Sequence, residues 1–333
     1  MAMRSLRWVL ALFLLNACDK QEVKSLPPSP AVPLPAASDG LPEPLPARPP
    51  SPDTRHVAPN VKELRTLQGI ESSSWAVALM PSEKHLLLAR NSDGLKIVDL
   101  ESALSVKAFP EYFTVTALAV MPDGKQAVIN RLIDNVPSQS LLDLRTGKIA
   151  KTYYQGRTDT MFVGVIGRGE HVICGGADVR IYRRESGEEV SKLKLADGQQ
   201  ACGWAPKGDT PLIVTMRRTG AGLRGVEFGV YDHALGKEVC TFHGPEKQYL
   251  ESVALLPDAG LIITLFASLV LKKSAPLGPP GWEYFLHIRS IGGDRFLWER
   301  VLDYYADKIL AHPDGRRFFL IGREIHEWQL FDP

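Results

Sequence analysis

The feature that most constrains the fold is a repeated pair of short apolar segments joined by a turn. Apolar residues 77–80 lead through Pro81 to residues 85–88, and the same pattern recurs around Pro122-Asp123-Gly124. Proline presets the first φ of a turn, and glycine permits a positive φ after it. The six turn positions lie 39 to 56 residues apart, at Pro81, Pro122, Gly167, Pro206, Pro257 and Pro313. The chain therefore contains six copies of one unit.

Each copy continues with a second pair of strands. The clearest is residues 140–144, a turn at 145–147 and residues 148–153, with related segments at 97–100, 180–182 and 230–232. Four strands in roughly 40 to 50 residues are typical of a propeller blade. We therefore predict an all-β fold, a β-propeller of six four-stranded blades over residues 61–333. Because the fifth copy is long, a seventh blade within it is the alternative.

The two ends of the repeating region complement each other. Residues 324–331 end the last copy at its third strand, and residues 62–67 precede the first copy. Together these segments supply one complete blade. Such closure removes the exposed edges that an open sheet would leave. We expect a closed, monomeric ring.

The N-terminus has the order of an export signal. Arg4 and Arg7 precede the apolar residues 8–15, and Asn16-Ala17-Cys18 follow. A charged start, a short apolar run and small residues are typical of a signal peptide. The run is far shorter than the roughly 20 residues of a membrane-spanning helix. We predict that residues 1–17 form a signal peptide.

Residues 15–18, Leu-Asn-Ala-Cys, resemble the bacterial lipoprotein box. The resemblance implies cleavage before Cys18 and acylation of its thiol with fatty acids such as palmitate. Two or three acyl chains give stable membrane attachment. The resemblance thus implies a membrane contact through Cys18 and a location in the cell envelope. It leaves open whether the membrane is the inner or the outer one. The alternatives are an ordinary secretory signal with an incidental cysteine, or a short buried helix.

Residues 18–60 are expected to form the lipidated N-terminus and a linker. Between Pro27 and Pro59 lie 12 of the chain's 25 prolines. Proline favours polyproline II at about 3.1 Å per residue, so the segment could span roughly 100 Å. We interpret it as a stalk. A docking site for a proline-binding partner is the alternative.

The repeating units of residues 61–333 resemble the WD-repeat and related bacterial propeller families of the YVTN/PQQ-like superfamily. The Gly-His and Trp-Asp dipeptides of the eukaryotic repeat are missing from this sequence. The resemblance therefore implies architecture and no particular activity.

The composition and motifs argue against several functions. The chain carries 39 Lys and Arg against 38 Asp and Glu, so no nucleic-acid partner is expected. Residues 220–225 have dinucleotide-binding spacing, but a strand-like segment follows where a helix is required. Cys174, Cys202 and Cys240 fall in different strands, and we expect free thiols rather than a disulfide or zinc site.

The strands expected to line the central channel are mostly apolar. Their polar positions are Ser74, Thr116, Glu251 and Lys308. Glu251 with Asp303 could form an acid/base pair, although solvated rim charges are commoner. We expect no enzyme, no cofactor and no metal. The alternatives are a propeller hydrolase or lactonase, or a propeller that binds a small ligand.

Two segments between second and third strands are candidates for partner binding. Loops of this length often carry function, and Arg, Trp and Tyr anchor interfaces. The candidate residues are Arg217, Arg218, Arg224, Lys272, Lys273, Trp282 and Tyr284. The alternative is a pair of tolerated insertions with solvated charges. We predict a membrane-anchored scaffold or sensor that presents its propeller to a protein partner in the bacterial envelope.

Overall fold

The computed structural model describes residues 59–67, 74–90, 93–134, 136–155, 160–218, 226–246, 248–270, 281–293 and 296–331. The predicted signal peptide, Cys18 and the proline-rich segment lie outside these residues. Residues 55–333 belong to one compact unit.

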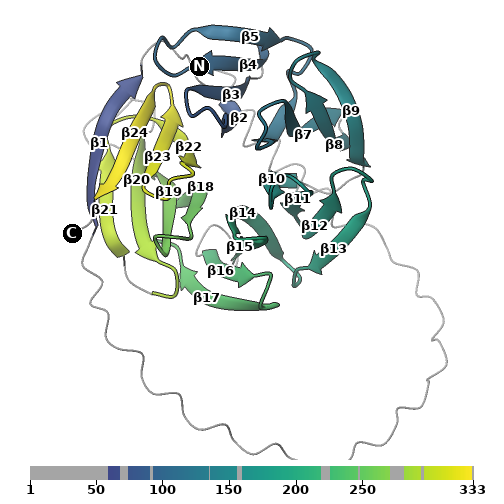
Figure 1. The fold of residues 1–333 in the computed structure, drawn as a ribbon. Coiled ribbons are helices and arrows are strands. Elements are labelled where there is room, and N and C mark those ends of the chain that lie inside the picture. Colours follow the sequence, from purple (N-terminus) through teal and green to yellow (C-terminus); the bar gives the residue numbers. More distant parts are fainter. Residues whose placement is uncertain are drawn as a thin grey trace, which may run out of the picture. The chain divides into compact units, whose positions relative to one another are not determined.

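Twenty-four strands form six antiparallel sheets of four strands in the described part of the chain (Figure 1). The first blade consists of β2 (Ser74–Leu79), β3 (His85–Arg90), β4 (Gly94–Asp99) and β5 (Ser105–Phe109). The second consists of β6 (Val115–Val120), β7 (Gln126–Ile133), β8 (Val136–Asp143) and β9 (Lys148–Gln155). The third consists of β10 (Thr160–Ile166), β11 (His171–Gly176), β12 (Asp178–Arg183) and β13 (Glu189–Lys194). The fourth and fifth are β14 (Gln199–Lys207), β15 (Thr210–Arg218), β16 (Val226–Asp232) and β17 (Lys237–His243); and β18 (Tyr249–Leu256), β19 (Leu261–Val270), β20 (Gly281–Ser290) and β21 (Phe296–Leu302).

The sixth blade closes the ring, and we call it the closing blade. It consists of β22 (Ala306–Ala311), β23 (Arg317–Gly322), β24 (Ile325–Phe331) and the first strand of the domain, β1 (Asn60–Leu67). β1 pairs antiparallel with β24, from Asn60 opposite Phe331 to Leu67 opposite Ile325. The inner strands β2, β6, β10, β14, β18 and β22 contact one another in succession around the ring (Figure 1). The predicted six-bladed propeller and its closure are confirmed.

The fifth blade accounts for the extra length of the fifth sequence copy. Its strands β19 and β20 have ten residues each and stay paired from Leu261 opposite Ser290 to Val270 opposite Gly281. The additional residues extend an existing hairpin. The alternative of a seventh blade is therefore wrong for the described residues.

The turns form for the reasons that their sequence suggests. In Pro122-Asp123-Gly124, the Asp123 carboxylate accepts a hydrogen bond from the Lys125 amide at 2.9 Å, and Gly124 has a φ of 68°. The Gly124 amide donates to the Met121 carbonyl at 2.8 Å. The positive φ favours glycine because it has no Cβ. These turns fix where each inner strand ends.

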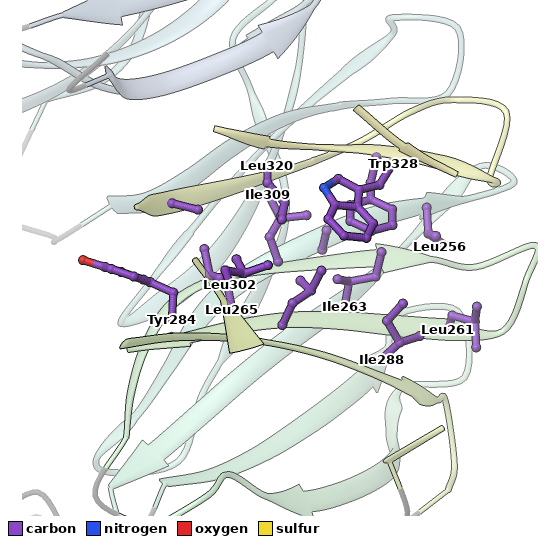
Figure 2. Close-up of a cluster of buried hydrophobic side chains, with 14 of the residues drawn as sticks. Leu256, Leu261, Ile263, Leu265, Tyr284, Ile288, Leu302, Ile309, Leu320 and Trp328 are labelled. Carbon is purple, nitrogen blue, oxygen red and sulfur yellow. The ribbon is translucent and has the colours of Figure 1, made fainter. Parts of the chain in front are cut away.

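The largest described core cluster lies where the fifth blade meets the closing blade. Figure 2 shows Ile263 and Leu265 of β19 with Leu320 of β23 and Trp328 of β24. Trp328 is fully buried, and its indole N–H donates to the Tyr304 hydroxyl at 3.2 Å. A buried indole with a satisfied N–H contributes a large apolar area without an unpaired donor. This packing joins the fifth blade to the closing blade.

Candidate functional site

The six inner strands surround a central cavity of about 500 Å³. We call its two sides the apolar wall and the polar wall. The apolar wall comes from the first four blades and consists of Val77, Ala119, Met161, Cys202 and Trp204. The polar wall comes from β18 and β22 and is named for Glu251, Ser252 and Lys308, which line the cavity beside apolar residues of the same strands such as Val253 and Leu310. The cavity thus combines a largely hydrophobic surface with a few polar groups on one side.

A β-bulge occurs near the start of every inner strand. The residues left out of register are Trp75, Thr116, Met161, Cys202, Glu251 and Asp307. A bulge locally bends a strand and re-aims a side chain. Because the bulge recurs at the same place in each blade, these residues lie at one end of the channel. We call this end the loop face, since the inner strands begin there.

Two adjacent bulged residues are acidic, Glu251 on β18 and Asp307 on β22. The Tyr305 hydroxyl donates to the Asp307 carboxylate at 2.7 Å. The Glu251 carboxylate forms no hydrogen bond or ion pair with the described residues. Burial, with the nearby Asp307 charge, raises the pKa of Glu251 to about 7, while Lys308 opposes the shift. Glu251 is therefore a titratable group on the channel wall.

Ser252 fixes the two strands of the polar wall to each other. Its hydroxyl oxygen accepts a hydrogen bond from the backbone amide of Ile309 at 3.0 Å. This bond connects β18 of the fifth blade to β22 of the closing blade. Since Glu251 precedes Ser252 and Lys308 precedes Ile309, the bond sets the separation of the two charged side chains.

Trp204 shapes the apolar wall through a close approach to the neighbouring blade. Its indole lies where a Cβ on Gly164 would be, and its N–H donates to the Val163 carbonyl at 3.3 Å. Only glycine fits at position 164 because any larger residue would collide with the ring. Thr116 also lies on this side, but its hydroxyl accepts a hydrogen bond from the Asn130 amide at 2.7 Å. The apolar wall therefore presents no free charge to the channel.

The structure assembles a different acidic pair from the one hypothesised from the sequence. The charges that act on Glu251 are Asp307 and Lys308, rather than Asp303. Asp307 of the closing blade is the residue that corresponds to Glu251 of the fifth blade. It stands six residues before Pro313, as Glu251 stands six residues before Pro257. Alignment on the turn prolines places the two side chains at equivalent positions.

The partner-binding candidates lie in different surroundings. Arg217 and Arg218 are exposed at the end of β15, and Arg217 pairs with Glu227 at 2.6 Å. Trp282 is part of β20, is 39% exposed, and contacts Tyr249 edge to face at 5.8 Å between ring centroids. Tyr284 is only 9% exposed and lies edge-on against Tyr305. The remaining candidates, Arg224, Lys272 and Lys273, lie outside the described residues.

The three cysteines of the described domain are free. Cys174 lies on β11, Cys202 on β14 and Cys240 on β17. Burial raises the pKa of the Cys202 thiol to about 12, so it is protonated at neutral pH. Among the described residues, no group of three or more His, Cys, Asp or Glu side chains could hold a metal ion. The same residues include no helix long and apolar enough to cross a membrane.

Comparison with known proteins identifies the architecture. No family model and no curated protein matches the sequence. Among solved structures, the chain is similar to Kuenenia stuttgartiensis hydrazine synthase, with a TM-score of 0.53 and 15% identity over 76% of this chain and 75% of that chain. As many as 1251 chains show structural similarity, so the likeness assigns the fold alone. The protein is a six-bladed β-propeller.

Proposed function

We propose that this protein is an exported lipoprotein, anchored in the bacterial cell envelope through Cys18, that presents its propeller as a protein-interaction scaffold. The N-terminal order of Arg4, Arg7, the apolar residues 8–15 and Cys18 supports export and lipidation. The proline-rich segment supports a stalk between lipid and domain. Its role is binding rather than catalysis, and its partner is a protein rather than a nucleic acid.

The observation that carries this proposal is an exposed set of interface-type residues on the loop face of two adjacent blades. Arg217 and Arg218 end β15 of the fourth blade, and Trp282 begins β20 of the fifth blade beside Tyr249. Arg, Trp and Tyr are the residue types that most often anchor protein interfaces. We call the exposed Arg217, Arg218 and Trp282, together with the half-buried Tyr249, the partner surface. Tyr284 is left out of it because its ring is buried.

The anchoring is tested in intact cells that express the full-length protein. We expect crosslinking to recover one specific envelope protein with the native sequence and to lose it with Cys18→Ser. The variant should also leave the membrane fraction. Retention of Cys18→Ser in that fraction, with an unchanged set of crosslinked proteins, would contradict lipid anchoring.

The partner surface is tested with two matched triple variants. In the first, Arg217, Arg218 and Trp282 become alanine. The control changes three exposed residues of the opposite face, Arg145 and Leu235 in turns and Arg183 at the end of β12. Arg183 pairs with Glu188 much as Arg217 pairs with Glu227. We expect the first triple alone to lose the crosslinked partner. Equal recovery with both triples would rule out this surface.

A further inference from the structure

The central cavity has the size and lining of a small-molecule site. Its volume of about 500 Å³ lies within the range of about 300 to 1,000 Å³ for ligand pockets. Such pockets are mostly apolar, with a few polar groups that orient the ligand. The apolar and polar walls divide the cavity in this way. A ligand that fits must therefore be amphipathic.

The polar wall contains two opposite charges that do not pair. Glu251 and Lys308 both line the cavity and influence each other electrostatically. Neither forms a hydrogen bond or ion pair with the described residues. The Ser252 hydroxyl is already bonded to the Ile309 amide and holds the two strands in place. A carboxylate and an ammonium are thus presented side by side to the cavity.

Leaving these groups unpaired is unfavourable. Glu251 is partly buried and next to a second carboxylate, Asp307, so its charged form is incompletely hydrated and repelled by a like charge, which Lys308 offsets only in part. A positively charged ligand group at Glu251 removes both penalties. The same ligand must offer a negative group to Lys308, because an ammonium alone would be repelled by that side chain.

We propose that the loop-face end of the channel binds a small zwitterion, an α-amino acid with an apolar side chain. Its ammonium contacts Glu251 with Asp307 behind it, and its carboxylate contacts Lys308. Its side chain lies against Met161, Cys202 and Trp204 of the apolar wall. This site is separate from the partner surface and does not depend on the scaffold function proposed above.

The protonation of Glu251 gives this binding a definite pH dependence. The groups around its carboxyl are Asp307 and Lys308 of β22 and Tyr305 before that strand, and the neighbouring inner strand β14 carries the protonated Cys202 thiol. The ammonium of the ligand binds only the ionised form of Glu251. Binding therefore releases the proton that Glu251 holds at lower pH. With a midpoint of about 7, the affinity should rise about tenfold from about pH 6 to about pH 8.

Isothermal titration of the purified full-length protein with three probes tests the site. Phenylalanine carries both charges, phenethylamine only the ammonium, and 3-phenylpropionate only the carboxylate. We expect phenylalanine to bind best and the other two to bind at least about tenfold more weakly, the loss of one charged contact. Absence of binding by phenylalanine at millimolar concentration, or equal binding by all three probes, would overturn the proposal.

Variants separate the site from a general effect on folding. We expect Glu251→Gln and Lys308→Met each to weaken phenylalanine binding at least about tenfold and Glu251→Gln to abolish its pH dependence. The control is Glu238→Gln on β17, where burial also raises the pKa of a carboxyl outside the cavity lining. Thermal melts confirm that each variant is folded. Equal loss with the control would overturn the assignment, and partner crosslinking should be unchanged in all three variants.

Discussion

The apolar and polar walls of the channel share one backbone design and differ in their side chains. Both are built from inner strands with a bulge near the loop face. At the bulge, the apolar wall has residues such as Met161 and Cys202, whereas the polar side has Glu251 and Asp307. The repeated fold determines where a channel residue lies, and a single substitution at that place determines its chemistry. The walls should therefore respond to mutation in different ways.

The largest effect is expected on the apolar wall. Trp204→Ala removes an indole that lies against Gly164 and bonds to Val163. Loss of a large, partly buried aromatic residue should lower the free energy of unfolding by about 3 kcal/mol. Because no titratable group is removed, the loss should be the same at about pH 5 and about pH 8. Urea unfolding at both pH values measures this loss of stability. A loss that changed with pH would contradict the proposed difference between the apolar and the polar wall.

A substitution on the polar wall should instead raise the free energy of unfolding, by an amount that depends strongly on pH. The folded-state pKa of Glu251 is raised to about 7, so the folded protein holds this proton more tightly than the unfolded chain. The stability from this group is present at low pH and is lost as pH rises from about 4.5 to about 7. Glu251→Gln should therefore raise the free energy of unfolding by about 2 kcal/mol at about pH 8 and by little at about pH 4.5. A variant less stable than the parent at the higher pH would contradict this assignment.

A buried histidine on the fifth blade should give the opposite pH dependence from Glu251, because burial there disfavours the positively charged form of the side chain. His287 on β20 is 1% exposed, lies beside Phe296 at 4.5 Å between ring centroids, and is 3.7 Å from Glu299. Burial, with the Arg289 charge, lowers its pKa to about 4. Stability from the neutral ring is therefore lost as pH falls from about 6.5 to about 4.

His287→Phe should remove this acid sensitivity while keeping the aromatic packing. Between about pH 7.5 and about pH 5, we expect the variant to lose about 1.5 kcal/mol less stability than the parent. Urea midpoints at the two pH values provide the measurement. The same loss in both proteins would show that His287 does not titrate in this range.

The smallest effect is expected at the link between the two strands of the polar wall. Ser252→Ala removes the acceptor for the Ile309 amide and should cost about 1 kcal/mol. It should also weaken phenylalanine binding, because the spacing of Glu251 and Lys308 is no longer fixed. A stability loss without any change in affinity would mean that this hydrogen bond supports the fold alone.

The sequence predicts the ring well because its turns are local signals. Pro122-Asp123-Gly124 forms a turn from its own residues, so the spacing of such turns reveals the blades. The bulges and the polar wall were not predictable in this way, because Glu251 and Asp307 meet only when blades from separate copies pack together. Tyr284 shows the same limit, since the proline and glycine residues before it favour a loop, while β20 begins at Gly281 and includes it.

Titration of the Glu251 carboxyl carbon by NMR, assigned with Glu251→Gln, tests the polar wall most directly. We expect a midpoint of about 7 that moves to lower pH when phenylalanine is added. A midpoint near the ordinary value of about 4.3, unchanged by the amino acid, would contradict both the buried carboxyl and the site built on it.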